Sequence, residues 1–413
     1  MIKAQTLKGF RDFLPLEAKK RQYVINTLKK VFESYGFEPL ETPALEYEEV
    51  LMGKYGEEGD KLMYRFEDNG KRKVALRYDQ TVPLARVVAQ YQNELPMPFK
   101  RYQIQNVWRA DNTQKGRYRE FLQCDIDTVG TSSPLADAEI IEIAIASLEK
   151  LGFKNFKVLV NDRENLKFNA NGISLSQDRN ILAVRAIDKL KKIGKDGVLR
   201  ELKENKFTNT EAEEILKIIE NARPTAYLKE VFSALNKLGV SETKYEFSPT
   251  LARGMDYYTG LILEVEVDEY TAGSLGGGGR FDNLIGMFAG KQIPAVGFAF
   301  GFDRLMEAME ELKLFPADLQ TTQVLITIFS SELLDKSIKV CEILSNKNIN
   351  QELYVDPDAK MEKQLKYADK KQIPYVIIIG PDEAKNNTVT LRNMKTREQE
   401  VLSLNSLTEK LQK

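Results

Sequence analysis

The chain has 413 residues, of which 60 are lysine or arginine, 61 are aspartate or glutamate, and none is histidine. The absence of histidine excludes a histidine-containing catalytic triad, a His-ligated zinc or haem, and an imidazole proton shuttle. The net charge of −1 excludes a basic coat, so any nucleic-acid contact must be confined to a local patch.

The first predicted element is a helix from Leu16 to Tyr35, where apolar residues recur at three- and four-residue steps and Gly36 follows. Pro39 and Pro43 come next, and they forbid a helix and fit an edge strand. The stretch 135–151 is apolar almost all round, which predicts a helix that is buried on more than one side.

Alternating apolar and polar residues predict strands at 102–108, 121–127, 156–160 and 263–267. Strands and helices are mixed irregularly, without a repeating βα unit. We therefore expect an α+β fold in which an antiparallel sheet is flanked by helices.

Two shifts in composition divide the chain. Between about residues 165 and 246 the sequence is lysine-rich, helical in pattern and without a strand signal, which indicates a helical module inserted into a domain at 1–320. From 321 to 413, continuous apolar runs such as 324–328 and 375–379 alternate with helical segments, as is typical of buried strands in a parallel sheet. A separate C-terminal α/β domain is expected there.

The first candidate site is the loop Arg109–Arg119, RADNTQKGRYR, which joins two predicted antiparallel strands. Arginines at the ends of such a hairpin can hold a phosphate or carboxylate bidentately, and the alternative is a solvated charged hairpin. On the second strand, Gln123, Asp125 and Asp127 share one face. Two carboxylates and an amide are thus expected on a single surface.

Three later segments carry weaker signals. The motif LARGMDYYTG at 251–260 could point Arg253 and Tyr258 into a pocket, although paired tyrosines are more often core residues. Gly276 to Gly279 lack the Walker and GxGxxG patterns, which leaves either a close backbone approach to a ligand or a flexible turn. A strand-like run that passes through glycine into a helical pattern places Arg304 near a helix start.

The two cysteines, Cys124 and Cys341, lie far apart and form no CxxC or metal-ligand spacing, so reduced thiols are expected. The first residues lack the apolar segment of a secretion signal, and no uncharged run reaches the roughly 18 residues of a membrane helix. A cytoplasmic protein that does not span a membrane is expected.

These motifs closely resemble those of the class II aminoacyl-tRNA synthetases, and specifically those of the histidyl-tRNA synthetase family. Gly9 to Asp12 with Pro43 is similar to the dimer-forming first motif, 76–81 to the amino-acid-binding segment, Arg109 to Asp127 to the second motif, and Phe298 to Arg304 to the third. LARGMDYYTG marks the histidine-specific branch. The resemblance covers nearly the whole chain, is weakest in the helical module, and departs from the family's usual residues at Gln80 and Phe281.

The resemblance implies a class II catalytic domain, an anticodon-binding domain at 321–413, and a homodimer that joins L-histidine to its cognate tRNA through a histidyl-adenylate. Joining a carboxylate to the α-phosphate of ATP requires fixed cations, because charge builds at phosphorus. Arg109 and Arg253 match the family's catalytic positions. The ATP contacts are assigned to Arg109, Arg117, Glu120, Phe121 and Arg304. Mg²⁺ bridging the phosphates is expected from nucleotide chemistry, and no side chain is assigned to it.

The resemblance also assigns the residues that bind histidine: Asp79, Gln80, Thr81, Arg109, Gln123, Asp127, Arg253, Tyr257 and Tyr258. A neutral imidazole offers one donor and one acceptor, for which Asp127 and Tyr258 have suitable chemistry. The ammonium group would be held by Asp79, Thr81 and Gln123. Such a pocket rejects an apolar impostor, whose binding would leave the polar groups unpaired.

Thr113, Gln114 and Lys115 at the loop tip are expected to touch the acceptor end of the tRNA. The C-terminal domain has 14 basic and 13 acidic residues over 321–413, so its RNA contact must be a local, salt-sensitive patch. A rival interpretation is a non-catalytic, histidine-binding regulatory paralogue from histidine biosynthesis. The C-terminal domain and the three arginines Arg109, Arg253 and Arg304 argue against that rival.

Overall fold

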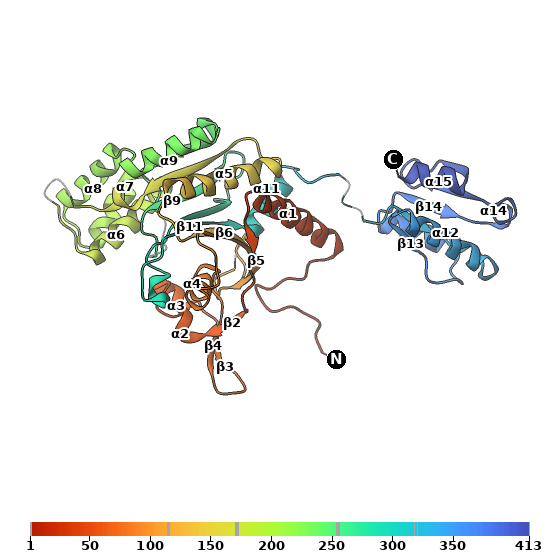
Figure 1. Ribbon diagram of the computed structural model, residues 1–413, viewed down its shortest axis with the longest axis horizontal. Helices are drawn as coiled ribbons and strands as arrows, with labels where there is room; N and C mark the ends of the chain where they lie inside the picture. The colour runs from red at the N-terminus through yellow and green to blue at the C-terminus, as the bar shows by residue number, and fades with distance from the viewer. Residues whose placement is uncertain are drawn as a thin grey trace. The chain divides into compact units, whose positions relative to one another are not determined.

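Figure 1 shows the computed structural model of the chain, which describes residues 2–113, 116–169, 173–252, 257–317, 319 and 321–412, except for the side chains of 56–58. Clustering of contacts separates two compact units, Met1–Phe315 and Pro316–Lys413. Within the described residues, every helix is too short or too polar to cross a membrane.

The first unit is built on an eight-stranded sheet with the order β1-β5-β6-β11-β10-β9-β7-β8. Its strands are β1 (Glu38–Pro39), β5 (Phe99–Trp108), β6 (Glu120–Val129), β7 (Phe156–Asp162), β8 (Tyr245–Phe247), β9 (Leu261–Val267), β10 (Gly276–Arg280) and β11 (Ala295–Gly301). Neighbouring strands are antiparallel except at the two edges, where β1 pairs with β5 and β7 pairs with β8 in parallel. The predicted antiparallel sheet is confirmed, and the proline-containing segment forms the short edge strand β1.

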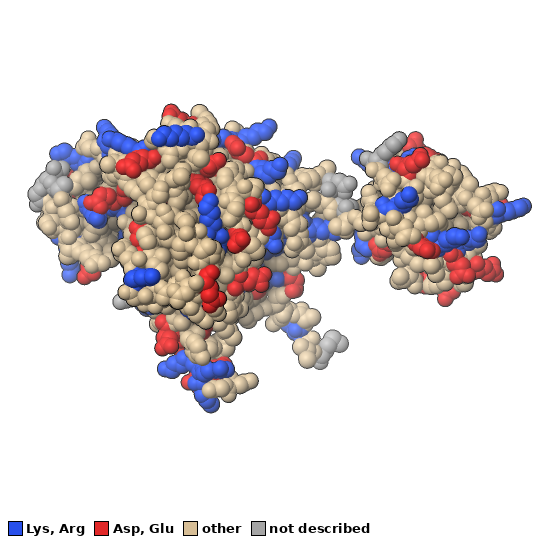
Figure 2. Space-filling view, in the orientation of Figure 1, with Lys and Arg blue, Asp and Glu red and all other residues tan. Residues whose placement is uncertain are grey.

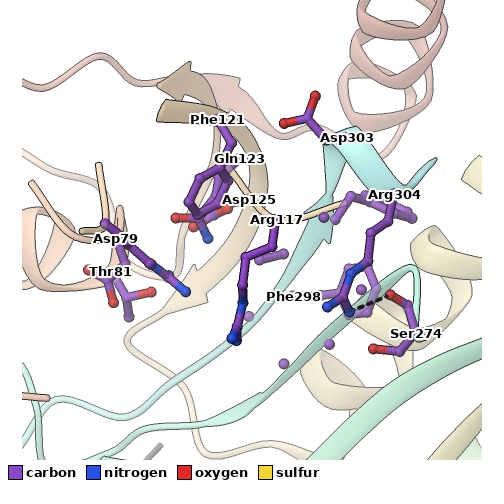
Figure 3. A pocket seen from close by; sticks show the side chains of 18 of the residues that line it. Asp79, Thr81, Arg117, Phe121, Gln123, Asp125, Ser274, Phe298, Asp303 and Arg304 are labelled. Carbon is purple, nitrogen blue, oxygen red and sulfur yellow. Dashed lines mark hydrogen bonds between the residues drawn. The ribbon is translucent and has the colours of Figure 1, made fainter. Parts of the chain in front are cut away.

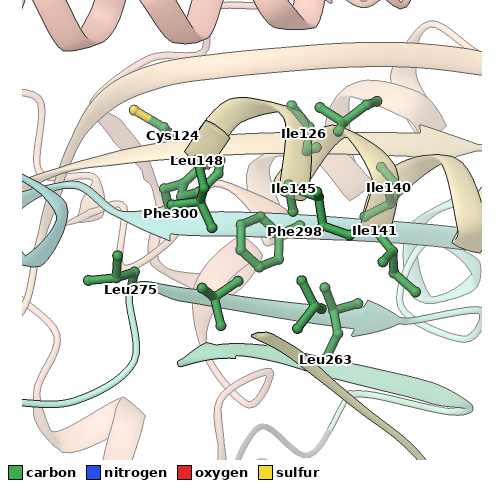
Figure 4. Packing of buried hydrophobic residues seen from close by; sticks show 14 of the residues in the cluster. Cys124, Ile126, Ile140, Ile141, Ile145, Leu148, Leu263, Leu275, Phe298 and Phe300 are labelled. Carbon is green, nitrogen blue, oxygen red and sulfur yellow. The ribbon is translucent and has the colours of Figure 1, made fainter. Parts of the chain in front are cut away.

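One face of this sheet is covered by three helices, α1 (Pro15–Ser34), α5 (Pro134–Lys150) and α11 (Phe302–Glu311). Helix α5 begins where Ser133 accepts the N–H of Leu135. Its buried residues Ile140, Ile141, Ile145 and Leu148 pack with Phe298 and Phe300 of β11 (Figure 4). Each such buried side chain stabilises the fold by roughly 1.5–3 kcal/mol.

The alternation of β6 decides where its polar residues go. Cys124 and Ile126 are fully buried in the core under α5. Because successive strand residues point to opposite faces, Gln123, Asp125 and Asp127 lie on the other face of the sheet, as predicted.

That other face is partly covered by a smaller layer. It contains a three-stranded sheet, β2 (Leu45–Tyr47), β3 (Arg65–Glu67) and β4 (Lys73–Leu76), and four helices, α2 (Glu48–Leu51), α3 (Gly56–Lys61), α4 (Thr81–Gln90) and α10 (Gly286–Ala289). Val82, Leu84 and Val88 of α4 share a core with Phe99 and Val129 at one end of the large sheet. At the other end of this face, Leu159 of β7 and Ile262 of β9 are buried in a second core, and the candidate site lies between the two packed ends, on β6, β11 and β10.

Four helices occupy the stretch between β7 and β8, namely α6 (Gln177–Asp188), α7 (Leu190–Glu204), α8 (Asn209–Asn221) and α9 (Ala226–Lys237), with short 3₁₀ turns at Arg163–Leu166 and Glu242–Lys244. Helix α8 starts at a capping box of Thr208 and Glu211. Helices α6 to α8 form a second core with Leu159 of β7 and Ile262 of β9, whereas Leu228, Val231 and Leu235 of α9 join the main core beside α5. The helical stretch therefore packs on both faces of the large sheet.

The second unit contains a five-stranded sheet with the order β13-β12-β14-β15-β16. Its elements are β12 (Val324–Ile326), a 3₁₀ turn (Ser331–Leu333), α12 (Leu334–Asn346), β13 (Gln351–Leu353), α13 (Met361–Lys370), β14 (Tyr375–Ile378), α14 (Pro381–Asn386), β15 (Thr388–Asn393), β16 (Gln399–Ser403) and α15 (Leu404–Leu411). The first three strands are parallel, but β14, β15 and β16 are antiparallel neighbours. The expected parallel pairing is thus correct for β12, β13 and β14 only, and the short connection after β15 permits an antiparallel hairpin with β16.

Candidate active site

A cavity of about 1180 Å³, counting its open mouth, lies on the sheet face that carries Gln123 and Asp127. Most of the predicted site residues line it: Asp79, Thr81, Arg109, Arg117, Phe121, Gln123, Asp127, Tyr257, Tyr258 and Arg304. They come from distant parts of the chain. Pairing of β6 with β11 and of β10 with β9 brings these parts together on one face.

The floor of the cavity is made largely by glycines of β10 and β11. A Cβ on Gly297 would overlap the Asp127 carboxylate, and a Cβ on Gly278 would overlap the carbonyl oxygen of Gly297. The four glycines at 276–279 therefore form a buried central strand, and the flexible-turn alternative is wrong. Without side chains, this floor lets a flat ligand approach the backbone closely.

Arg109 is held at the end of β5. Its Nε donates to the Tyr78 carbonyl oxygen at 3.0 Å, and its guanidinium carbon lies 4.4 Å from the ring centre of Tyr78 and 5.2 Å from that of Phe121. Its backbone N–H donates to the Arg119 carbonyl oxygen, which closes the hairpin. The remaining N–H groups form a planar fork beside the cavity, suited to a phosphate or carboxylate.

Two further arginines line the cavity. In Figure 3, Asp79 and Thr81 lie at one end of the view, Arg304 at the other, and Arg117 between them. Arg304 sits in the first turn of α11 and donates through Nη1 to the Ser274 carbonyl oxygen at 3.3 Å. The half-exposed Arg117 has its Nε 3.6 Å from a carboxylate oxygen of Asp111. The cavity thus has a cationic end that matches the charge of a polyphosphate.

The opposite end is acidic. Asp79 accepts hydrogen bonds from the Tyr55 hydroxyl at 2.8 Å and from the Val82 N–H at 3.1 Å, and burial nevertheless raises the pKa of its carboxyl. Burial also raises the pKa of Asp125 well above its usual range, and that of Asp127 to about 6. These three carboxyl groups favour a ligand that brings positive charge and N–H donors.

The paired tyrosines form part of the wall. The rings of Tyr257 and Tyr258 meet edge to face with centres 4.9 Å apart. Tyr257 shares a hydrogen bond with the side chain of Thr81, and burial, with Tyr258 and Asp79, raises its pKa well above the ordinary value. Its hydroxyl therefore stays protonated at neutral pH. Both tyrosines line the cavity, so the core-only alternative for this pair is not supported.

Other predicted site residues are placed elsewhere. Gln80 is fully buried behind the wall, where its Nε2 donates to the Gln105 carbonyl oxygen at 2.8 Å. Glu120 accepts a hydrogen bond from Asn106 at 3.1 Å and does not line the cavity. Thr113 is half-buried in the hairpin loop and does not line the cavity either. Arg253, Gln114 and Lys115 lie outside the described residues.

The sequence analysis missed a polar layer behind the acidic end. Arg101 is completely buried, its Nη2 lies 2.7 Å from the Asp127 carboxylate, and its Nη1 donates to Gln103. Gln103 in turn donates to Thr42 at 2.8 Å. The register that places Arg101 opposite Asp127 on β5 and β6 follows from pairing the two predicted strands across their loop. This strand register could have identified Arg101 as the partner of Asp127 from the sequence.

The described residues contain no cluster of three acidic or thiol side chains that could hold a metal ion. Mg²⁺ commonly binds through phosphates, waters and one or two carboxylates. The acidic groups Asp111 and Asp303 line the cavity. Both carboxylates are already engaged by arginines, with Arg117 near Asp111, and Arg11 and Arg21 near Asp303. A metal ion in this cavity would therefore depend mainly on the ligand that accompanies it.

Comparison with known proteins matches this architecture. The profile of the histidyl-tRNA synthetase family matches residues 9–305, and that of an anticodon binding domain matches residues 323–413. The chain is 40% identical to a histidine–tRNA ligase of Cytophaga hutchinsonii, with 100% of both chains covered. It is 43% identical to one of Aeropyrum pernix, covering 93% of this chain and 92% of the relative. The crystal structure of a histidyl-tRNA synthetase from Nostoc sp. PCC 7120 superposes with a TM-score of 0.86 at 30% identity, covering 100% of this chain and 99% of that one.

Proposed function

The chain belongs to the histidyl-tRNA synthetase family, and from this premise we propose that it activates L-histidine with ATP and transfers it to its cognate tRNA. The single observation that carries the proposal is the polarity of the cavity. Arg304 lies at one end and Arg117 between the ends, three buried carboxyl groups line the other end with Arg109 beside them, and a glycine floor joins the two. A zwitterionic amino acid and a polyphosphate can lie in that order along such a floor.

In the first step the histidine carboxylate attacks the α-phosphorus of ATP, pyrophosphate leaves, and histidyl-adenylate forms. Arg109 would orient the attacking carboxylate and the α-phosphate, with Arg253 as a second catalytic cation. Arg304 and Arg117 would hold the distal phosphates, and Phe121 would offer its face to the adenine. Fixed cations stabilise the charge that develops at phosphorus without reorganising during the reaction. Mg²⁺ would accompany the nucleotide and neutralise part of its charge.

Recognition of the imidazole would rest on Asp127 and Tyr258. The guanidinium of Arg101, 2.7 Å from Asp127, favours the ionised form of that carboxyl and so opposes the effect of burial. The ionised carboxylate would accept the imidazole N–H, and the Tyr258 hydroxyl would serve the other ring nitrogen. An apolar side chain would form neither of these hydrogen bonds, which supports discrimination without an editing site.

The tRNA is proposed to contact both units, through Thr113 to Lys115 at the acceptor end and through the unit at 321–413 at the anticodon. Positive and negative side chains are interspersed on the face that Figure 2 shows. This distribution supports local contacts. RNA affinity should therefore fall as salt rises, because each phosphate contact releases counterions.

We also propose a cytoplasmic homodimer whose catalytic domain spans 1–320, with the helical insertion at about 165–246. Leu45, Tyr47 and Phe66 on the small sheet are 43–53% exposed, which is unusual for large apolar side chains gathered on one element. A second copy would cover them. Sedimentation or light scattering of the full chain tests this assignment.

The decisive experiment is ATP–pyrophosphate exchange with each of the twenty amino acids in turn. Exchange with histidine alone is expected. Absence of histidine-dependent exchange would contradict the proposed function. Histidine binding without exchange would favour the regulatory paralogue from histidine biosynthesis.

A further inference from the structure

Four oxygen atoms at the acidic end of the cavity are buried and receive no directed hydrogen bond from a described residue. One of them, Oδ2 of Asp127, lies 2.7 Å from Nη2 of Arg101, which leaves three others: Oδ2 of Asp79, Oε1 of Gln123 and Oδ1 of Asp125. All three side chains line the same cavity. Buried acceptors without donors are costly and therefore rare in folded proteins. Three of them in one cavity indicate that a ligand supplies the missing donors.

The strand neighbours of Asp125 and the buried Arg101 direct their side-chain donors elsewhere. On β5 it faces Gln103, whose side-chain N–H groups already donate to Thr42 at 2.8 Å and to Gln105 at 2.6 Å. On β11 it faces Ala299. Arg101 is directed at Asp127 and Gln103, and its Nε–H reaches no acceptor.

We propose that Asp125 is the third acceptor for the α-ammonium group of the amino-acid substrate, beside Asp79 and Gln123, an inference that rests on the proposed function. An ammonium group has three N–H donors and no acceptor, so the number of its donors equals the number of these three oxygens. Thr81, which the family resemblance assigns to the same group, already shares a hydrogen bond with Tyr257. Asp125 thus adds a second carboxylate to the recognition of a free amine.

The charges around Asp125 couple this contact to the release of a proton. Burial raises its pKa well above the usual range, Asp127 and Asp79 add to the rise, and Arg101 and Arg109 oppose it. In the free protein these surroundings favour the protonated form of the carboxyl. When the ammonium group arrives, the carboxylate form is stabilised and its proton passes to solvent. Histidine binding then releases a proton and tightens as the pH rises.

Isothermal titration calorimetry of the full chain tests the contact, with two ligands and with buffers of different ionisation enthalpy. The ligands are L-histidine and 3-(imidazol-4-yl)propionate, which lacks the amino group. Asp125→Asn should bind histidine about 10- to 100-fold more weakly, as expected for a lost charge-assisted hydrogen bond, and without proton release. The same variant should bind the desamino ligand as tightly as the wild type does.

Asp162→Asn is the matched control. Asp162 is also a buried aspartate of the large sheet and ends β7, but it accepts hydrogen bonds from Glu164 and Thr225 and does not line the cavity. Its substitution should leave both affinities and the proton release unchanged. Asp125→Asn should melt no lower than the wild type, because it removes a buried carboxyl group whose Oδ1 receives no hydrogen bond from a described residue. Asp125→Ser provides a second variant, for which the same selective loss of histidine affinity is expected.

The inference is overturned if the two Asp125 variants bind histidine as the wild type does, or if they lose histidine and the desamino ligand equally. Histidine-dependent pyrophosphate exchange by the wild type is measured alongside. If the wild type shows no exchange, the proposed function fails. If exchange is normal and the variants show no selective loss, only the role of Asp125 fails.

Discussion

Two buried arginine–aspartate pairs in the first unit differ in how completely they are hydrogen-bonded. Arg280 meets Asp137 through Nε at 3.2 Å and also through Nη2, and the Tyr227 hydroxyl donates to the same carboxylate at 2.8 Å. Arg101 lies 2.7 Å from Asp127, yet its Nε and the Asp127 Oδ2 make no directed hydrogen bond with any described residue. The first pair is saturated and the second is not.

The difference separates a structural role from a binding role. The saturated pair ties the end of β10 to the first turns of α5, away from the cavity. Asp127 of the unsaturated pair lines the cavity with Asp125 and Asp79, where uncompensated polar atoms lower stability until a ligand binds. Unsatisfied groups of this kind are typical of sites at which a protein gives up stability for function.

The largest effect is expected from breaking the saturated pair with Arg280→Met. The substitution leaves the buried Asp137 without its partner, so the free energy of unfolding should fall by about 3–5 kcal/mol. Chemical denaturation followed by circular dichroism measures this change. Histidine-dependent exchange per folded molecule should be retained, because Arg280 does not line the cavity. A decrease in the free energy of unfolding of less than about 1 kcal/mol would contradict a structural role for this pair.

Arg109→Gln should do the opposite, since it removes a cation at the reacting atoms and leaves the fold intact. Histidine-dependent pyrophosphate exchange should fall about 100- to 1000-fold, whereas the free energy of unfolding should change by less than about 1 kcal/mol. Arg109→Lys is the control, because it keeps the charge but not the planar fork. Full exchange by the glutamine variant would exclude Arg109 from the chemistry.

The pH dependence of stability sharpens the comparison at the unsaturated pair. Burial raises the pKa of folded Asp127 to about 6, above its unfolded value near 4, so the folded state binds more protons. The resulting stabilisation is complete below about pH 4 and is lost as the pH rises through 6. The difference in the free energy of unfolding between the wild type and Asp127→Asn should therefore fall by at most ~3 kcal/mol between pH 4 and pH 7. Urea unfolding at several pH values measures it, and parallel curves would contradict the assigned pKa.

The smallest effect is expected from Tyr227→Phe. This variant removes one donor from the saturated carboxylate of Asp137, while both arginine contacts remain. The free energy of unfolding should fall by about 1 kcal/mol. A loss as large as that of Arg280→Met would show that the hydroxyl, and not the guanidinium, carries the pair.

Much of the fold follows from local patterns. The helix at 135–151, the hairpin around Arg109–Arg119 and the shared face of Gln123 and Asp127 were all predictable, because helical and strand periodicities decide which residues face the core. The mixed order of the C-terminal sheet was not. Its last two strands are partly exposed and lack the continuous apolar run that identifies a buried strand.

The sequence by itself determined which chemistry this protein cannot use and which polar residues share one face of its sheet. A chain without histidine must rely on arginines and carboxylates, and strand alternation assigns those groups to one face. Only the tertiary structure decided which of these arginines and carboxylates have all their hydrogen-bond partners. Strand order places Arg101 of β5 and Gly297 of β11 on either side of Asp127, and burial then leaves Oδ1 of Asp125 without a donor among the described residues. Desolvation depends on neighbours from distant segments, and no local pattern encodes it.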